Sequence, residues 1–351
     1  MSRSFQIAVI ILIAAPLLSS YAQEKDPREL FAESIFNEDT PLDVELISDM
    51  HHFRKEKFED EYQPAYVRFT VADGTILEDS IRIKARGNFR RKTCYYPPVR
   101  LNFKKSAFTP KDTSSFLDKI KLVSICKSSP QYEQYVVKEY LVYKMYELIT
   151  DYSIRARFMN IKFVDVFKEK MKEKETVAFI LEDIDEVAYR KNAMEFDMKN
   201  LQEGSVYPEI IVDLLVFQFM IGNTDYSIPG VHNFKYLKIK DPTIFTPVVV
   251  PYDFDYCGFV NADYAIPNPV VPIQKVTQRI YWGLCRPRAD FEKSFAKFRE
   301  LRPQFESIIR DCQYLDDNNK RAGLAYIEDF YEIINDERKV TNYFINGCRK
   351  K

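Results

Sequence analysis

The stretch AYVRFTVADGTILEDSIRIKARG, residues 65–87, predicts a β-hairpin with one apolar and one basic face. Two runs rich in β-branched and aromatic residues flank the turn Ala72-Asp73-Gly74, a pattern typical of antiparallel strands joined by a tight turn. Apolar and basic residues then alternate strictly from Ile81 to Arg86. Because successive side chains of a strand point to opposite faces, the basic side chains share one face. That face is either simply solvated or a surface for an anionic ligand.

Further strands of this kind surround the hairpin. They are predicted at residues 42–49, 98–103, 119–126, 156–167 and 176–183. Residues 131–150 have the composition and length of a helix. We therefore expect an α+β protein whose amino-terminal lobe, residues 41–190, is a twisted antiparallel sheet with one cationic face and one long helix, preceded by a linker at residues 23–40.

Glu139 lies in the middle of the apolar stripe of the predicted helix. A carboxylate on an apolar face is costly unless a cation contacts it, so pairing with a Lys or Arg of the sheet is one expectation. The other is a side chain at the edge of the stripe that reaches water.

The second half of the chain is predicted to be a mainly helical lobe, residues 191–351. A polar, helical stretch ends near Gly204, and residues 207–221 are apolar nearly all round, which indicates a buried helix. Residues 233–240 and 245–255 then predict a small hairpin, and helices are expected from Asp290 onward.

The predicted hairpin ends in VVVPYDFDYCG, residues 248–258, where two aspartates follow a buried strand. In an extended chain Asp253 and Asp255 project to the same side, and neighbouring carboxylates are tolerated best around a divalent cation. If the hairpin folds back, Asp225 and Asn233 converge with this pair. The alternative is an aspartate pair that only ends a strand and caps a turn.

Charge and the first residues bound the setting of the protein. The 51 Lys and Arg residues nearly balance the 52 Asp and Glu residues, which gives no support for nucleic-acid binding. Residues 1–22 resemble a secretory signal cleaved after Ala22, because a basic start and a short apolar run precede small residues. We therefore expect a secreted or periplasmic chain with no membrane anchor after cleavage. Its six cysteines permit up to three disulfides, with the pairing open.

Four short motifs, in order, resemble the atypical protein kinases related to spore coat protein H. They are the R-x-RGN-like element at residues 82–88, the basic strand at residues 99–103, Gly222-Asn223-Thr224-Asp225, and Pro251-Tyr252-Asp253-Phe254-Asp255 before Gly258. The chain departs from the family in having Tyr252 for a Trp and Arg100 for a Lys.

The resemblance implies a two-lobed, protein-kinase-like fold with the site on the small hairpin. It also implies transfer of phosphate from ATP to Ser or Thr hydroxyls of an exported protein, with magnesium or manganese. Asp225 would be the catalytic aspartate, and Asp253 the main metal ligand, assisted by Asp255 or Asn233. Glu139 would pair with a cation near the nucleotide, and Arg86, Arg100 and Lys121 would contact phosphates.

Two other classes of function stay open from the sequence. One is a catalytically inactive, kinase-like binding module of the cell envelope, in which the acids hold calcium or structure a loop. The other is a metal-dependent glycosyltransferase, because a D-x-D motif also holds a metal against a nucleotide diphosphate. The antiparallel hairpins disfavour the glycosyltransferase, for which alternating strands and helices are expected.

Overall fold

The computed structural model describes residues 26–109, 118–167 and 172–350. The predicted signal segment, residues 1–22, lies outside them. Residues 27–34, inside the predicted linker, form helix α1 (Pro27–Ser34), because the Asp26 side chain accepts a hydrogen bond from the backbone of Arg28 and Pro27 begins the helix.

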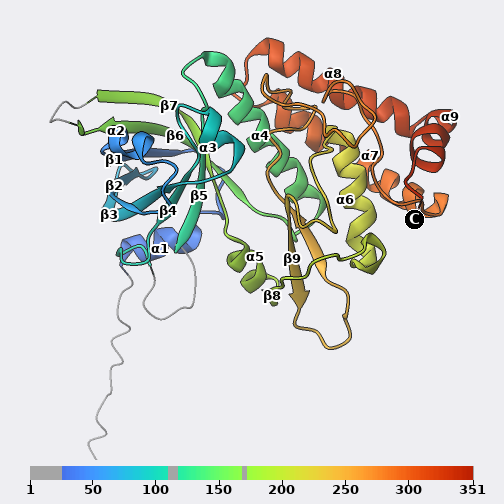
Figure 1. The fold of residues 1–351 in the computed structure, drawn as a ribbon, viewed down its shortest axis with the longest axis horizontal. Helices are drawn as coiled ribbons and strands as arrows, with labels where there is room; N and C mark the ends of the chain where they lie inside the picture. The colour runs from blue at the N-terminus through green and yellow to red at the C-terminus, as the bar shows by residue number, and fades with distance from the viewer. Residues whose placement is uncertain (1–25, 110–117, 168–171, 351) are drawn as a thin grey trace, which may run out of the picture.

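The amino-terminal part of the chain is a closed β-barrel (Figure 1), in which the strands follow the order β1-β2-β3-β4-β5-β7-β6. Its strands are β1 (Leu42–Ser48), β2 (Gln63–Thr70), β3 (Ile76–Ala85), β4 (Val99–Asn102), β5 (Lys119–Ser124), β6 (Ala156–Asp165) and β7 (Lys172–Leu181). The expected strands are thus present and pair antiparallel as expected, except for β1 with β6, but the sequence did not predict that the sheet closes. Strand β1 pairs with β6 in parallel, which closes the sheet and removes both of its edges.

The long helix α4 (Pro130–Ile149) lies between the barrel and a helical part of the chain (Figure 1) and contacts both. Short helices α2 (Met50–Lys55) and α3 (Phe89–Thr93) accompany the barrel. The helical part contains α6 (Pro208–Ile221), α7 (Arg288–Arg310), α8 (Asp317–Ile334), α9 (Glu337–Val340) and a π-helical turn at Thr341–Asn346. The α+β class is therefore confirmed, and no helix in the described residues is both long and apolar enough to span a bilayer.

The small hairpin of the second half is part of a three-stranded sheet, in the order β10-β9-β8. Strands β9 (Phe234–Ile239) and β10 (Val248–Pro251) were expected, whereas β8 (Ala193–Glu195) lies where a helical stretch was predicted. Only α5 (Ile184–Arg190) and a 3-10 turn at Glu203–Ser205 are helical there. The prediction failed because pairing of Ala193–Glu195 with β9 outweighs the weak preference of a polar segment for helix.

Two disulfides join segments that are distant in the sequence. Cys94–Cys126 ties the end of α3 to the residues after β5, and Cys285–Cys348 ties the start of the carboxyl-terminal helices to the end of the chain. Among the described residues, Cys257 and Cys312 are free thiols.

The loop after α6 is joined directly to the loop after β10. Gly222 ends α6 with a left-handed φ of 64°, and its carbonyl accepts a hydrogen bond from the backbone of Gly258 at 3.0 Å. The backbone of Phe259 likewise donates to Ile221 at 3.0 Å. These bonds place the two acidic loops side by side.

Gly222→Ala is expected to lower the free energy of unfolding by about 1–3 kcal/mol, because alanine is strained at a positive φ. A Cβ there would also collide with the Tyr326 hydroxyl. Chemical denaturation measures the effect, with Gly204→Ala as the matched control, since a Cβ at Gly204 meets no atom within 4 Å. Equal stability of the two variants would show that Gly222 is not required by its backbone conformation.

Candidate functional site

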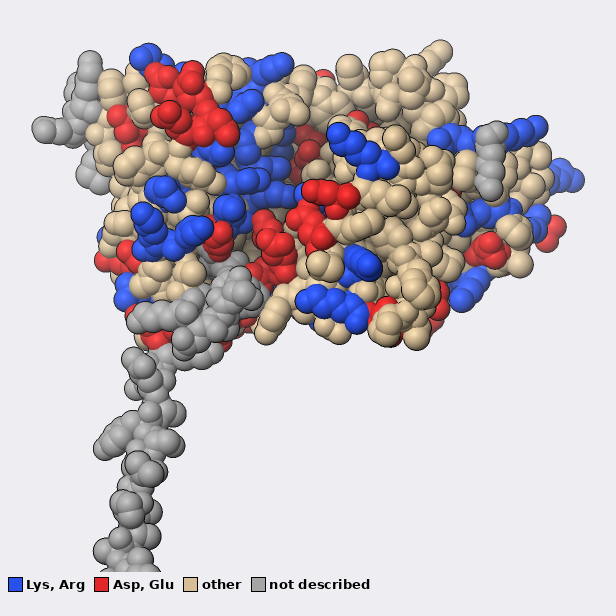
Figure 2. Space-filling model, turned by 60° about the horizontal axis from the view of Figure 1, so that its bottom comes forward, with Lys and Arg blue, Asp and Glu red and all other residues tan. Residues whose placement is uncertain are grey.

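A cleft of about 730 Å³ lies between the barrel and the loops that precede and follow the β9–β10 pair. Seven of the eight site residues predicted from the sequence line it: Arg86, Arg100, Lys121, Asp225, Asn233, Asp253 and Asp255. The eighth, Glu139, contacts Arg90, which lines the cleft. On the face shown in Figure 2, Lys and Arg side chains form a band next to a group of Asp and Glu side chains.

The barrel side of the cleft carries a row of like charges across three strands. The register places Lys84 opposite Arg100, and Arg100 opposite Lys121. Like charges directly opposite each other destabilise a sheet. Lys84 is relieved by an ion pair with Asp60, 2.7 Å between Nζ and Oδ1, but Arg100 and Lys121 form no ion pair with any described residue.

Lys121 is the most buried of these cations. Burial, assisted by the charges of Arg86, Lys235 and Arg100, lowers the pKa of Lys121 to about 8. Its ammonium lies 4.8 Å from the centre of the Tyr252 ring. A buried cation among other cations becomes more favourable if an anion enters the cleft, so this row could bind an anionic ligand.

Asp225 is held on the opposite side of the cleft by its own loop. The backbone of Asp225 donates to the Asn223 side chain at 3.0 Å, and Asn223 is itself buried and bonded to Gln218 of α6. The carboxylate of Asp225 accepts from Asn233 Nδ2 at 3.0 Å and contacts His232 Nε2 at 3.0 Å. The Gly-Asn-x-Asp sequence thus links the helix end to a fixed carboxylate.

Asp253 and Asp255 both line the cleft, but not in the way that the sequence predicted. Strand β10 ends at Pro251, and Asp253 has a left-handed φ of 66°, so the pair does not lie on an extended chain. Phe254 is buried between them, which turns Asp253 and Asp255 toward the cleft. Val231 and Asn233 also have positive φ values, 53° and 57°. Such conformations are costly for residues other than glycine and gather at functional sites.

Arg90 is the cation that meets Glu139. Its Nη1 lies 3.4 Å from Glu139 Oε2 and 3.9 Å from Asp255 Oδ2, and its Nη2 donates to the Ser124 carbonyl at 2.7 Å. Glu139 is therefore paired with a cation and does not reach water. The partner comes from α3, however, and not from a strand of the sheet, because α3 folds over the end of the barrel and is held there by the Cys94–Cys126 disulfide.

Burial raises the pKa of both carboxylates that contact Arg90. For Asp255 the pKa rises to about 7 because of burial and the charge of Asp253, against the opposing effect of Arg90. Burial and Asp255 raise the pKa of Glu139, and Arg90 again opposes the rise. Tyr264 donates a hydrogen bond to Asp255 Oδ2 at 3.1 Å. The site thus holds more negative charge than Arg90 alone compensates.

Asp253 and Asp255 are the residues of the cleft that could hold a magnesium ion. Magnesium uses one or two carboxylates and completes its shell with water and phosphate oxygens, and Asp253 and Asp255 supply such a pair. In the described part of the chain, no group of three or more His, Cys, Asp or Glu side chains is arranged to hold a metal. Asn233 uses its amide nitrogen on the carbonyl and the carboxylate of Asp225, so its part in the structure is to position that residue.

Six polar residues of the cleft were not among the predicted site residues. Asn88 and Tyr252 were quoted only as parts of motifs, and Arg90, His232, Lys235 and Tyr256 were missed altogether. Arg90 had a usable signal, because it follows Arg86-Gly87-Asn88 within the same short motif. His232 and Lys235 flank the predicted Asn233 and could have been found by the same proximity. Tyr256 packs against the exposed ring of Phe89, with 5.7 Å between ring centres. This contact joins segments that are distant in the sequence, so no local pattern predicts it.

No protein-family model matches this chain, and no curated protein sequence is significantly similar to it.

Asp255→Asn is expected to change the stability of the protein more favourably at pH 8 than at pH 5. The pKa of Asp255 is raised in the folded state, so the wild-type protein loses stability as the pH rises from about 4 toward 7. Asparagine does not titrate, and the variant escapes this loss. We expect the melting temperature of the variant minus that of the wild type to be higher at pH 8 by about 2 °C or more. An equal difference at both pH values would contradict the assignment.

Arg90→Met is expected to make stability fall more steeply between pH 5 and pH 8. Without the guanidinium the pKa values of Glu139 and Asp255 rise further, because each ionised carboxylate lacks its partner. Leaving a buried charge without its partner lowers the free energy of unfolding by about 3–5 kcal/mol. Denaturant titrations across this pH range measure the slope. Arg91→Met is the control, because Arg91 belongs to the same short helix and has no contact with these acids among the interactions of the described residues.

Proposed function

We propose that this chain is an exported phosphotransferase of the atypical kinase type related to spore coat protein H. It would transfer phosphate from ATP to Ser or Thr hydroxyls of a protein, with magnesium. The observation that carries the proposal is the cleft itself, in which Asp225 and the more distant pair Asp253 and Asp255 line the same space as barrel cations that form no ion pair with a described residue.

The arrangement of the chain supports a two-lobed reading. The barrel would be the amino-terminal lobe and the helical part the carboxyl-terminal lobe, with α4 and Glu139 between them. The closed barrel does not clearly match the two-lobed, kinase-like fold that the resemblance implied, so the proposal rests on the site and not on the architecture. The two disulfides are compatible with an exported protein.

Asp225 would accept a hydrogen bond from the hydroxyl group of the substrate. Asn233 and His232 hold its carboxylate, so little reorganisation is needed when the substrate arrives. In the transfer, the substrate oxygen forms a bond to the γ-phosphorus while the bond to the ADP oxygen breaks. The hydroxyl proton passes to Asp225, and ADP leaves with the bonding electron pair.

Arg86, Arg100 and Lys121 would contact the phosphates of the donor. They supply charge from side chains, which suits a chain without a glycine-rich phosphate loop. Asp253 and Asp255 would hold magnesium, which when bound neutralises charge on the phosphates. The positive charge of Arg90 behind Asp255 keeps this carboxylate in place while the metal and nucleotide are absent.

A catalytically inactive, kinase-like binding module is the second candidate. It is favoured by the contacts that Asp255 already makes with Tyr264 and Arg90, which occupy part of its coordinating capacity. Such a module would bind a ligand in the cleft without turning it over.

Thermal shift of the chain from residue 23 onward separates these functions. The protein is mixed with ATP, a UDP-sugar or neither, each with and without magnesium. A stabilisation that requires both ATP and magnesium is expected from the kinase. Stabilisation by the UDP-sugar with magnesium would favour a glycosyltransferase, and the absence of any shift would exclude nucleotide binding.

Asp253→Asn is expected to abolish the magnesium-dependent part of the ATP shift, because it removes a metal ligand. Asp225→Asn is expected to retain that shift and to lose phosphate transfer to a mixed Ser/Thr peptide substrate by about 100-fold or more. Transfer by the wild type is followed with γ-labelled ATP. Nucleotide binding without transfer by the wild type would support the inactive module, and retention of full transfer by Asp225→Asn would overturn the role of this residue.

A further inference from the structure

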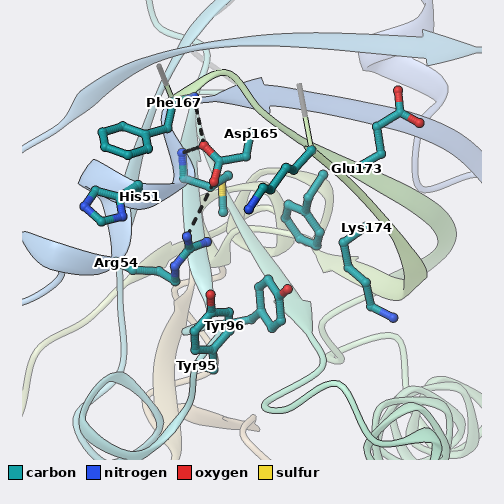
Figure 3. Close-up of a pocket in the computed structure, with 11 residues that line it drawn as sticks. His51, Arg54, Tyr95, Tyr96, Asp165, Phe167, Glu173 and Lys174 are labelled. Atoms are coloured by element: carbon teal, nitrogen blue, oxygen red, sulfur yellow. Dashed lines mark hydrogen bonds and ion pairs between the residues drawn. The ribbon is translucent and has the colours of Figure 1, made fainter. Parts of the chain in front are cut away.

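A second cavity, of about 570 Å³, lies on the barrel and shares no lining residue with the cleft. We call it the aromatic cavity, because rings from four segments line it: His51, Tyr95, Tyr96, Phe163 and Phe167. Its size is that of a pocket for a small molecule. Figure 3 shows His51 beside Phe167 on one side, with Arg54 between Asp165 and the two tyrosines.

The aromatic walls are held rigidly. The backbone groups of Tyr95 and Tyr96 donate to the Cys126 carbonyl at 2.9 and 3.2 Å, next to the Cys94–Cys126 disulfide. Tyr96 stacks on Phe163 with 6.0 Å between ring centres, and His51 stacks on Phe167 at 4.1 Å. Tyr95 nevertheless keeps 55% of its surface exposed, so a flat ring surface remains open to a ligand.

The two carboxylates of this cavity are already engaged. Asp165 accepts from the backbone of Met50 at 3.0 Å, from that of Phe167 at 3.1 Å and from Arg54 at 3.4 Å. Glu173 at the rim is paired with Lys162 at 3.1 Å.

Donors, by contrast, are in surplus. Arg54 spends one N–H group on Asp165 and rests its guanidinium 4.8 Å from the centre of the Tyr95 ring, which leaves other N–H groups without a protein acceptor in the described residues. At the rim, Lys172 and Lys174 form no ion pair with a described residue. A site with free donors, positive charge and flat apolar walls selects an anion that carries a ring.

We propose that the aromatic cavity binds a small anionic aromatic ligand, an aryl phosphate or aryl carboxylate, with its charge at Arg54 and its ring against Tyr95. The ring stacks where the tyrosine is exposed, and the anion takes the guanidinium donors that Asp165 leaves unused. This site is independent of the proposed phosphotransfer, because none of its residues lies in the cleft.

The test is fluorine NMR of probes mixed with the chain from residue 23 onward. The probes are 4-fluorophenyl phosphate and 4-fluorobenzoate. Trifluoroacetate, which has charge without a ring, and 4-fluorobenzyl alcohol, which has a ring without charge, are the controls. We expect broadening and saturable binding for the two aryl anions, and at least tenfold weaker binding for both controls.

Arg54→Met is expected to weaken binding of the aryl anions about tenfold, since a charge-assisted hydrogen bond is lost. Arg82→Met is the matched control, because Arg82 also rests on a tyrosine, 5.3 Å from the Tyr62 ring, on the same barrel outside both cavities. Tyr95→Leu is a second variant, which removes the ring contact. Because Tyr95 is exposed, this variant stays informative even if Arg54→Met does not fold. Thermal melts confirm that each variant is folded.

The probes also separate this site from the cleft. Asp253→Asn leaves aryl-anion binding unchanged if the cavity is the site, whereas failure of ATP binding alone bears only on the proposed phosphotransfer. A tripeptide that carries phosphotyrosine between two glycines tells whether the ligand comes from a polypeptide, by binding more tightly than the free aryl phosphate. Equal binding by wild type, Arg54→Met and Tyr95→Leu, or equal binding of trifluoroacetate, would overturn the proposal.

Discussion

The buried guanidinium of Arg90 joins the parts of the chain that make the cleft. It contacts Glu139 on α4, Asp255 on the loop after β10, and the Ser124 carbonyl at the end of β5. Each of these groups belongs to a different structural unit, and each is deeply buried. Two buried carboxylates repel each other in a poorly screened environment, and the guanidinium of Arg90 reduces that repulsion. Arg90 therefore holds together the parts of the chain that form this side of the cleft.

Near Arg90, the loops of the cleft contain backbone conformations that are unfavourable for residues other than glycine. Val231, Asn233 and Asp253 have left-handed φ values, and the hydrogen bonds of Asn233 to Asp225 and of Tyr252 to Asn233 keep this part of the loop in place. The hydrogen bonds from Gly258 to Gly222 and from Phe259 to Ile221 also join these two loops. Strain of this kind persists only where the surrounding structure fixes it, and here it serves to aim carboxylates at a common space.

The barrel presents two surfaces of different chemistry. Toward the cleft it carries Arg86, Arg100 and Lys121, which have charge and little apolar surface. At the aromatic cavity it carries rings and a single fixed arginine, Arg54. The Cys94–Cys126 disulfide lies between them in the chain: α3 with Arg90 precedes it, and Tyr95 and Tyr96 follow Cys94. One covalent bond therefore stabilises a wall of each site.

The sequence by itself determined the strands of the barrel, the long helices and most of the candidate residues. Alternation in residues 81–86 predicted β3, the apolar run at residues 207–221 predicted α6, and the motif positions placed seven of eight predicted residues at one cleft. These signals are local, because side-chain periodicity and turn residues act within a few positions of each other. Only the tertiary structure decided that the sheet closes through β1 and β6, that Ala193–Glu195 becomes a strand, and that Arg90 is the partner of Glu139. Each of those depends on a contact between residues far apart in the chain, whose formation is set by packing and burial and leaves no periodic trace in the sequence.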